Sequence, residues 1–309
     1  MNDGKRAMAT PHDRSKVWLV TGCSTGIGRA LAEQVLKRGY RCVATARDPA
    51  KIRDLADAYP KTSRALSLDV SNPAQGDRAI AEAESAFGGI DVLVNNAGYG
   101  YYAAVEEGED AEIRTMFETN FFGLVGMTQR VLPGMRARGR GHIVNISSVG
   151  GLVGNPSYGF YSATKFAVEG LTESMAKEVG PLGIRVTLIE PGPFRTDFQG
   201  RSVHVVRKPL DAYANTAGAR RAQLAANSGK QPGDPIRAAD AIIQVVESPD
   251  PPLHLLLGKV AVDRAHEKFT GLMRSMDEWR DVSLDVDFPA QEPGASGAHS
   301  RPGTLGTKG

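Results

Sequence analysis

The sequence predicts an α/β protein: one doubly wound domain in which helices cover both faces of a parallel sheet of about seven strands. Short apolar runs alternate with longer segments of helical character, which is typical of strand–helix–strand units. The runs contain few polar residues, as expected for strands that are buried on both faces. The alternation is unbroken, which favours one domain over the two that a length of 309 residues allows.

The first half of the chain sets this alternation. An apolar run at 17–20 meets glycines, and the helical segment at 27–38 ends at Gly39, because glycine commonly stops a helix. The same pattern then repeats along the chain. Further strands are predicted at 42–45, 65–68 and 91–94, and further helices at 50–59 and 73–87.

The second half continues in the same way. Residues 109–138 have a helical pattern that is predicted to break near Asn120. Residues 194–234 show no strong pattern, but their apolar side chains and an alanine-rich helix at 212–226 predict a mobile lid over the substrate. The remaining predicted strands are 142–146, 184–189 and 253–257, and the remaining helices are 157–179 and 238–246.

The two ends of the chain are predicted to lie outside the domain, which spans residues 16–288. Residues 1–15 contain no apolar stretch of the kind that a secretory signal needs, so a flexible tail on a cytoplasmic protein is expected. Residues 289–309 are rich in proline and glycine, with Leu305 as the single large aliphatic residue, and predict a disordered tail.

The composition argues against several classes of function. A formal net charge of +2 disfavours a protein that binds nucleic acid or an anionic membrane by charge. Apolar runs stay far below the ~18 residues of a membrane helix, so no membrane insertion is expected. Two cysteines, Cys23 and Cys42, rule out a disulfide-rich scaffold. The six histidines lack the spacing of metal ligands, so no metal site is predicted.

A glycine-rich segment, 21–28, joins the first strand to the first helix. Its glycines Gly22, Gly26 and Gly28 allow a tight turn and a close approach of the backbone to phosphate. A pyrophosphate at the positive N-terminus of the helix would accept hydrogen bonds from free backbone N–H groups. A glycine-rich turn without a ligand is the alternative, but the place directly after the first strand favours a dinucleotide site.

The end of the second predicted strand indicates which dinucleotide binds. NAD enzymes usually carry a carboxylate there, which bonds the ribose 2′-hydroxyl. This chain has Ala46 followed by Arg47, and a guanidinium is suited to a 2′-phosphate. The hydroxyls of Ser24 and Thr25 would add hydrogen bonds, so NADP is the predicted cofactor. The alternative is that Arg47 is an ordinary surface residue.

Tyr161 and Lys165 lie four residues apart in the helix predicted at 157–179 and therefore share one face of it. The ammonium favours the phenolate, so we expect the pKa of Tyr161 to be lowered for acid–base work near neutrality. Ser148 is expected to hold a substrate oxygen, and Asn120, through its side chain or its freed carbonyl, a water that links Lys165 to solvent. An exposed pair without function is the alternative, because this spacing also arises by chance.

The ordered set of motifs resembles that of the short-chain dehydrogenase/reductase family, in its compact form with TGxxxGxG and YxxxK motifs. The resemblance covers residues 16–265 and implies a single-domain Rossmann fold. With Arg47 after it, the glycine loop is similar to that of NADP-preferring members such as hydroxysteroid and retinol-type dehydrogenases. The motifs, in order, are the glycine loop, Asp69-Val70, Asn95-Asn96-Ala97-Gly98, Asn120, Ser147-Ser148, Tyr161 to Lys165 and Pro191-Gly192.

The resemblance implies a role for each matching residue. Tyr161 is the general acid/base, Lys165 lowers its pKa and bonds the nicotinamide ribose, and Ser148 polarises the substrate oxygen. Asn120 belongs to the proton relay. The implied cofactor-binding residues are Gly22, Ser24, Thr25, Gly26, Ile27, Gly28 and Arg47; Asp69 and Val70 at the adenine; Asn96, Ala97 and Gly98 at the adenosine ribose; Tyr161 and Lys165; and Pro191, Gly192 and Thr196 at the carboxamide.

The predicted function is hydride transfer between NADP(H) and a carbonyl compound or secondary alcohol, with a lipophilic small molecule as substrate. The resemblance also implies a homodimer or homotetramer. A catalytically idle NADP-binding sensor or scaffold is disfavoured by the complete catalytic set. A sugar-nucleotide epimerase or dehydratase is disfavoured by the glycine spacing and by the lack of a larger C-terminal domain. The basic pairs at 207–208 and 220–221 are expected to be solvated surface residues.

Overall fold

A computed structural model describes residues 14–200 and 202–288. The C-terminal tail predicted at 289–309, and all but the last two residues of the tail predicted at 1–15, lie outside this range. The chain divides into two compact units, one up to Lys268 and one from Phe269 onward, and each is described by itself.

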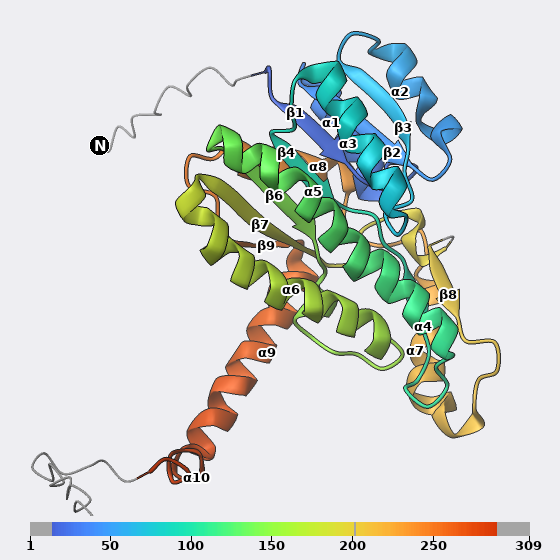
Figure 1. Ribbon diagram of the computed structural model, residues 1–309. Helices are drawn as coiled ribbons and strands as arrows, with labels where there is room; N and C mark the ends of the chain where they lie inside the picture. Colours follow the sequence, from blue (N-terminus) through green and yellow to red (C-terminus); the bar gives the residue numbers. More distant parts are fainter. Residues whose placement is uncertain (1–13, 201, 289–309) are drawn as a thin grey trace, which may run out of the picture. The chain divides into compact units, whose positions relative to one another are not determined.

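Seven parallel strands form the central sheet of the first unit, in the order β3-β2-β1-β4-β6-β7-β9 (Figure 1). The chain starts in the middle of the sheet, winds outward to β3, returns to β4 beside β1, and winds outward again to β9. The doubly wound, parallel arrangement predicted from the sequence is confirmed. The strands are β1 (Val17–Val20), β2 (Arg41–Ala46), β3 (Ser63–Ser67), β4 (Val92–Asn95), β6 (Gly141–Ile146), β7 (Ile184–Pro191) and β9 (His254–Leu257).

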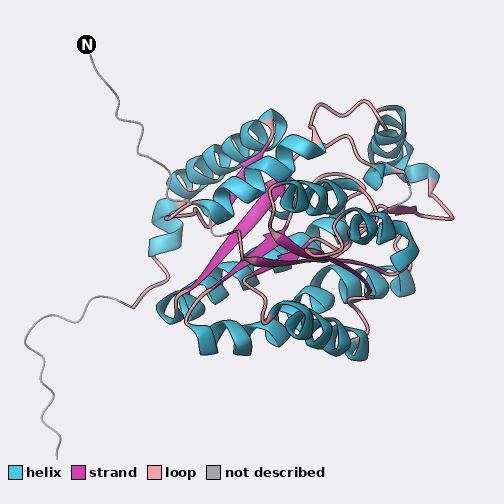
Figure 2. Cartoon of the chain, turned by 90° about the horizontal axis from the view of Figure 1, so that it is seen from above, coloured by secondary structure: helices cyan, strands magenta, loops and turns pink. Residues whose placement is uncertain are grey.

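Helices cover both faces of this sheet (Figure 2). Because side chains of a strand alternate between the faces, Trp18 and Val20 pack into one apolar layer and Leu19 into the other. Both faces are therefore buried, which explains why the strands are apolar throughout. The first layer is formed with α1 (Gly26–Lys37), α2 (Arg53–Ala58) and α8 (Pro235–Glu247), and the second with α3 (Pro73–Phe87), α5 (Gly123–Arg138) and α6 (Gly159–Val179).

The long helical segment predicted at 109–138 is interrupted where the sequence predicted a break. α4 (Asp110–Phe117) leads into a π-helical turn, Glu118–Phe122, which is followed by α5. Asn120 lies in this turn and is buried. Such a turn inserts one extra residue into the helix and is frequent at functional sites.

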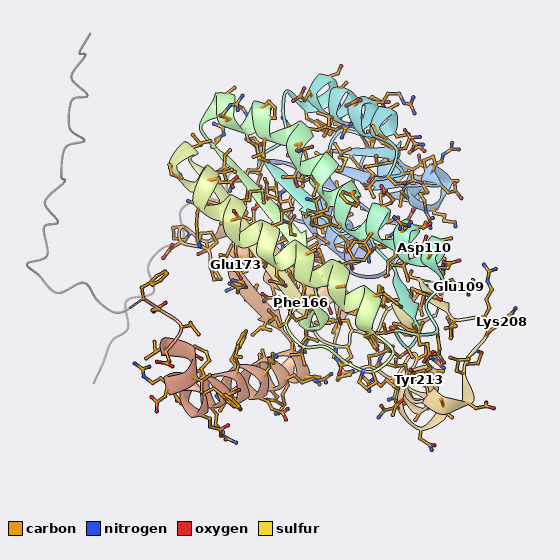
Figure 3. The ribbon with its side chains drawn as sticks, turned by 60° about the horizontal axis from the view of Figure 1, so that its bottom comes forward. Glu109, Asp110, Phe166, Glu173, Lys208 and Tyr213 are labelled. Atoms are coloured by element: carbon orange, nitrogen blue, oxygen red, sulfur yellow. The ribbon has the colours of Figure 1, made fainter. Side chains whose placement is uncertain are left out.

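The segment after β7 is anchored by two short strands that the sequence did not predict. β5 (Gly100–Tyr102) pairs in parallel with β8 (Val203–Val205). Figure 3 shows Lys208 of this segment near Glu109, which precedes α4, and the N–H of the neighbouring Arg207 donates to Glu109. The helix predicted at 212–226 is confirmed only in part: a π-helical turn, Ala214–Gly218, precedes the short α7 (Ala219–Ala226).

A further helix that the sequence analysis missed, α9 (Lys259–Glu278), starts in the first unit, where Ala261 and Ala265 are buried. The second unit contains the rest of α9 and the short α10 (Arg280–Leu284). Among the residues that the structure describes, no helix is both long and apolar enough to span a membrane.

Candidate active site

A cavity of about 890 Å³ opens where β1, β2, β4, β6 and β7 end. Ligands bind at this edge in doubly wound sheets. Nearly all of the site residues predicted from the sequence line it, and the two exceptions, Gly28 and Asn120, lie behind its wall. The lining members of the predicted set are Gly22, Ser24, Thr25, Gly26, Ile27, Arg47, Asp69, Val70, Asn96, Ala97, Gly98, Ser148, Tyr161, Lys165, Pro191, Gly192 and Thr196.

The glycine loop is held from behind by Asn96. Its side-chain Nδ2 donates to the carbonyl oxygens of Thr21 at 2.8 Å and Gly22 at 3.0 Å. A Cβ on Gly28 would lie 2.2 Å from this nitrogen, so only glycine fits there. Gly22 requires glycine for a different reason, because its φ of +72° lies in the left-handed region. The glycines thus let the loop and the start of α1 pack closely against the end of β4.

The N-terminus of α1 faces the cavity with free donors. Thr25 is the N-cap but makes no side-chain hydrogen bond to the first turn, and this turn carries no acidic residue. Gly26 and Ile27 line the cavity there, and a Cβ on Gly26 would lie 3.5 Å from the Cβ of Thr196 across the gap. Uncapped N–H groups at a positive helix end form an anion site, so these residues fit a dinucleotide pyrophosphate.

The far end of the cavity has the donors and acceptors expected around an adenosine. Arg47 is exposed at the end of β2, lines the cavity together with Ser24 and Thr25, and forms no ion pair with a described residue. Asp69 follows β3, and its carboxylate accepts hydrogen bonds from the backbone N–H and the hydroxyl of Ser71, at 3.0 and 2.6 Å. These residues would hold the adenosine and its ribose.

Tyr161 is buried at the opposite end of the cavity, on α6. Burial raises the pKa of its phenol above the ordinary range, and the hydrogen bond with the Ser148 side chain opposes this rise. The predicted lowering of this pKa by Lys165 is therefore wrong for this structure. Lys165 Nζ lies 5.8 Å from the centre of the Tyr161 ring and donates instead to the Ile146 carbonyl at 2.9 Å. Desolvation thus outweighs the distant ammonium.

Lys165 is buried as well, and burial lowers its pKa to about 8. The carboxylate of Glu169, one turn further along α6, opposes this by favouring the ammonium. Glu169 accepts a hydrogen bond from the Ser147 hydroxyl, next to Ser148. Its own pKa is raised to about 7, chiefly by burial.

Glu169 belongs to a polar cluster that the sequence did not indicate. His254 Nδ1 on β9 hydrogen-bonds Glu190 Oε1 on β7 at 2.7 Å and lies 3.7 Å from Glu169 Oε2. The three side chains lie close enough to share a cation. The prediction of no metal site rested on the spacing of the histidines along the chain, and it stays a prediction beside this cluster. Spacing along the chain gave no signal, because α6, β7 and β9 are brought together only by the fold.

Asn120 is fixed by hydrogen bonds within the protein. Its Nδ2 donates to the Tyr99 carbonyl at 2.8 Å and to the Thr164 hydroxyl at 3.2 Å, and its Oδ1 accepts from the Tyr99 N–H at 3.0 Å. Of the two groups proposed for holding a water, the side chain is engaged. The main-chain carbonyl in the π-helical turn is the remaining candidate.

The substrate end of the cavity contains residues that the sequence analysis missed or misplaced. The pair at 220–221 is not a solvated surface: Arg220 lines the cavity, and Arg221 pairs with the buried Glu107 at 2.5 Å. The spacing of Arg220 and Leu224 by four residues in an alanine-rich helix was the available signal, because Leu224 is buried. Other lining residues here are Tyr99, Tyr102, Asn155, Tyr158, Phe194, Phe198, Lys230 and Arg264.

Comparison with known proteins agrees with this geometry. Residues 16–205 match the family model described as short chain dehydrogenase. Oxidoreductase BOA17 of Botryotinia fuckeliana is 37% identical over 87% of this chain and 98% of its own length. A 3-ketodihydrosphingosine reductase of Bacteroides thetaiotaomicron is 36% identical over 79% of this chain and 88% of its own.

A solved structure shows the same likeness in three dimensions. The short-chain dehydrogenase from Streptomyces avermitilis superposes with a TM-score of 0.83 and 42% identity, covering 88% of this chain and 99% of that one. The family match spans more than half of the chain, and the cavity combines a dinucleotide cradle with a tyrosine, serine and lysine set. The chain therefore belongs to the short-chain dehydrogenase/reductase family of NAD(P)-dependent oxidoreductases that act on CH–OH groups.

Proposed function

We propose that the protein interconverts a secondary alcohol and the corresponding ketone with NADP(H) as its preferred cofactor, and that Tyr161 is the general acid/base. The observation that carries this proposal is that the buried Tyr161 phenol and the Ser148 side chain, whose interaction favours the phenolate, line the same cavity as the uncapped N-terminus of α1. A bound nicotinamide supplies or accepts the hydride.

The protein residues handle the proton. A phenol whose pKa is raised stays protonated at neutral pH, which suits donation to a carbonyl oxygen. Ser148 holds that oxygen by a hydrogen bond during the transfer. The Lys165 ammonium, whose Nζ lies 5.8 Å from the ring centre, then returns a proton to the phenolate, and it is reprotonated from solvent through a water that the main-chain carbonyl of Asn120 holds. Oxidation of the alcohol follows the reverse course.

The cofactor preference rests on Arg47. Arg47 is exposed at the end of β2 and lines the same cavity as Ser24 and Thr25, and Ala46 stands where NAD enzymes carry an acid. A guanidinium without a carboxylate partner can bind a 2′-phosphate through two hydrogen bonds.

Oxidation of NADPH and of NADH, measured with a panel of ketones and aldehydes, tests this proposal. We expect NADPH to be preferred, and the Arg47→Gln variant to raise the KM for NADPH by roughly tenfold or more while leaving NADH unchanged. Arg53→Gln, an exposed arginine on the neighbouring α2, is the matched control. Equal use of the two cofactors by the unmodified enzyme would contradict the role of Arg47.

A further inference from the structure

The substrate end of the cavity carries an excess of positive charge. Arg220, Lys230 and Arg264 all line it, in addition to Lys165 on its floor. Among the described lining residues the single carboxylate is Asp69, which lies at the adenosine end after β3. A purely apolar substrate would not use these charges, and holding them near a cavity wall without carboxylate partners costs free energy.

Arg220 is placed over an aromatic wall next to the catalytic tyrosine. Its Cζ lies 5.7 Å from the centre of the Tyr158 ring, and that ring lies 6.1 Å from the ring of Tyr161. Nη1 donates to the Gln223 side chain at 2.6 Å, a neutral partner. Nε is buried and has no hydrogen-bond partner among the described residues. The guanidinium therefore keeps donors for a ligand.

Arg264 reaches the same place from α9. Its Nη2 donates to Asn155 Oδ1, again a neutral partner, and the backbone carbonyl of Asn155 accepts from the Tyr158 N–H at 3.1 Å. Both guanidinium charges act on the Tyr158 phenol, where they oppose the rise of its pKa caused by burial. Two arginines without a carboxylate partner in the described part of the chain thus converge one aromatic ring away from Tyr161.

Apolar side chains line the same end of the cavity, among them Phe194, Phe198 and Leu224. A guanidinium fork matches a carboxylate or a phosphate, and arginines are the usual means of reading such groups. We propose that the substrate is an amphiphilic ketone or alcohol that carries an anionic group, carboxylate or phosphate, bound by Arg220 and Arg264. This inference rests on the proposed function and adds a charged end to the lipophilic substrate expected from the sequence.

Matched compounds test the inference. Ketones of equal chain length that end in a carboxylate, a phosphate monoester, a methyl ester or an amine are compared over a series of lengths with NADPH. We expect kcat/KM to be at least about tenfold higher for one anionic class than for the ester, and lowest for the amine. The carboxylate and phosphate arms identify which anion is bound.

Variants connect the preference to the two arginines. Arg220→Gln and Arg264→Gln are each expected to lower kcat/KM for the anionic ketone by about tenfold to a hundredfold, mainly through KM, and to leave the ester nearly unchanged. Arg220→Lys should restore part of the loss. Arg237→Gln is the matched control, because the Arg237 side chain is 88% exposed and does not line the cavity. NADPH binding, followed by fluorescence, confirms that each variant is folded.

The inference is overturned if kcat/KM for the ester ketones equals that for the anionic ketones at every length. It is also overturned if the arginine variants lower kcat/KM equally for both classes. Compounds that are not turned over are compared by calorimetric binding to the NADP⁺ complex, and acids that bind no tighter than esters overturn it as well. In each case, reduction of the ketone in the ester compounds that depends on Tyr161 would leave the proposed function standing. If the Tyr161→Phe variant still reduces the ketone in the ester compounds, the proposed function is contradicted instead.

Discussion

Tyr161 and Lys165 have pKa values that burial moves in opposite directions. The pKa of the phenol is raised, so it stays a proton donor at neutral pH. The pKa of the ammonium is lowered to about 8, so it can lose its proton close to physiological pH. Two titratable groups separated in this way are suited to acid and relay roles. Glu169 supports the ammonium, and it is in turn surrounded by Ser147, Glu173, Glu190 and His254.

The electrostatic interaction between Glu169 and Lys165 predicts a change in pH dependence. With a pKa of about 7, Glu169 is charged at pH 8, where it favours the ammonium. We expect carbonyl reduction to fall above about pH 8, and Glu169→Gln to move this fall to lower pH by about one unit. The measurement is kcat/KM against pH. Glu178→Gln, which changes an exposed acid on the same helix, is the control. If the fall of kcat/KM at high pH is not moved in Glu169→Gln, the electrostatic coupling between Glu169 and Lys165 is refuted.

Among the elements, α7 is tied to the rest of the fold by a buried ion pair. Glu107 and Arg221 are joined by two hydrogen bonds, at 2.5 and 3.2 Å, and Glu107 also accepts from the N–H groups of Ala104 and Leu210. This single carboxylate therefore ties α7 to the loop after β5. The Arg221 guanidinium and these hydrogen bonds lower the pKa of Glu107 to about 2.

Loss of Arg221 should therefore destabilise the protein. Arg221→Gln leaves the Glu107 carboxylate buried without its counter-charge, and we expect the free energy of unfolding in urea to fall by about 3 kcal/mol. Because the pKa of Glu107 is lowered, its contribution is present above about pH 4.5 and is lost as the pH falls through about 2. The exposed Arg237→Gln should have little effect. An unchanged unfolding curve for Arg221→Gln at neutral pH would show that the pair does not anchor α7.

The elements that the sequence predicted are those with strong local patterns. β1 at 17–20 and α3 at 73–87 agree with their predicted bounds, and the break at Asn120 is real. The missed pair β5 and β8 is short and joins segments about a hundred residues apart, so nothing local indicates it. Periodicity also did not separate the π-helical turn from α7 in the predicted helix 212–226.

For the molecule as a whole, the sequence predicted the residues of the site better than their electrostatics. Glycines, Tyr161 and Ser148 are required by local geometry and chemistry, so motif spacing identifies them. The pKa values of Tyr161 and Lys165 depend on how deeply the whole fold buries them. The inward placement of Arg220 depends likewise on packing between distant segments. Such properties appear only once the chain is folded.

In the proposed function, one buried phenol handles the proton in a cavity that also holds the dinucleotide. Tyr161→Phe keeps the ring and its packing but removes the hydroxyl, so the most direct test compares this variant with the unmodified enzyme. Single-turnover reduction of a reactive ketone is measured together with the Kd for NADPH. We expect a rate lower by at least about a hundredfold with an unchanged Kd. A variant that binds NADPH normally and reduces the ketone at close to the original rate would contradict the proposed function.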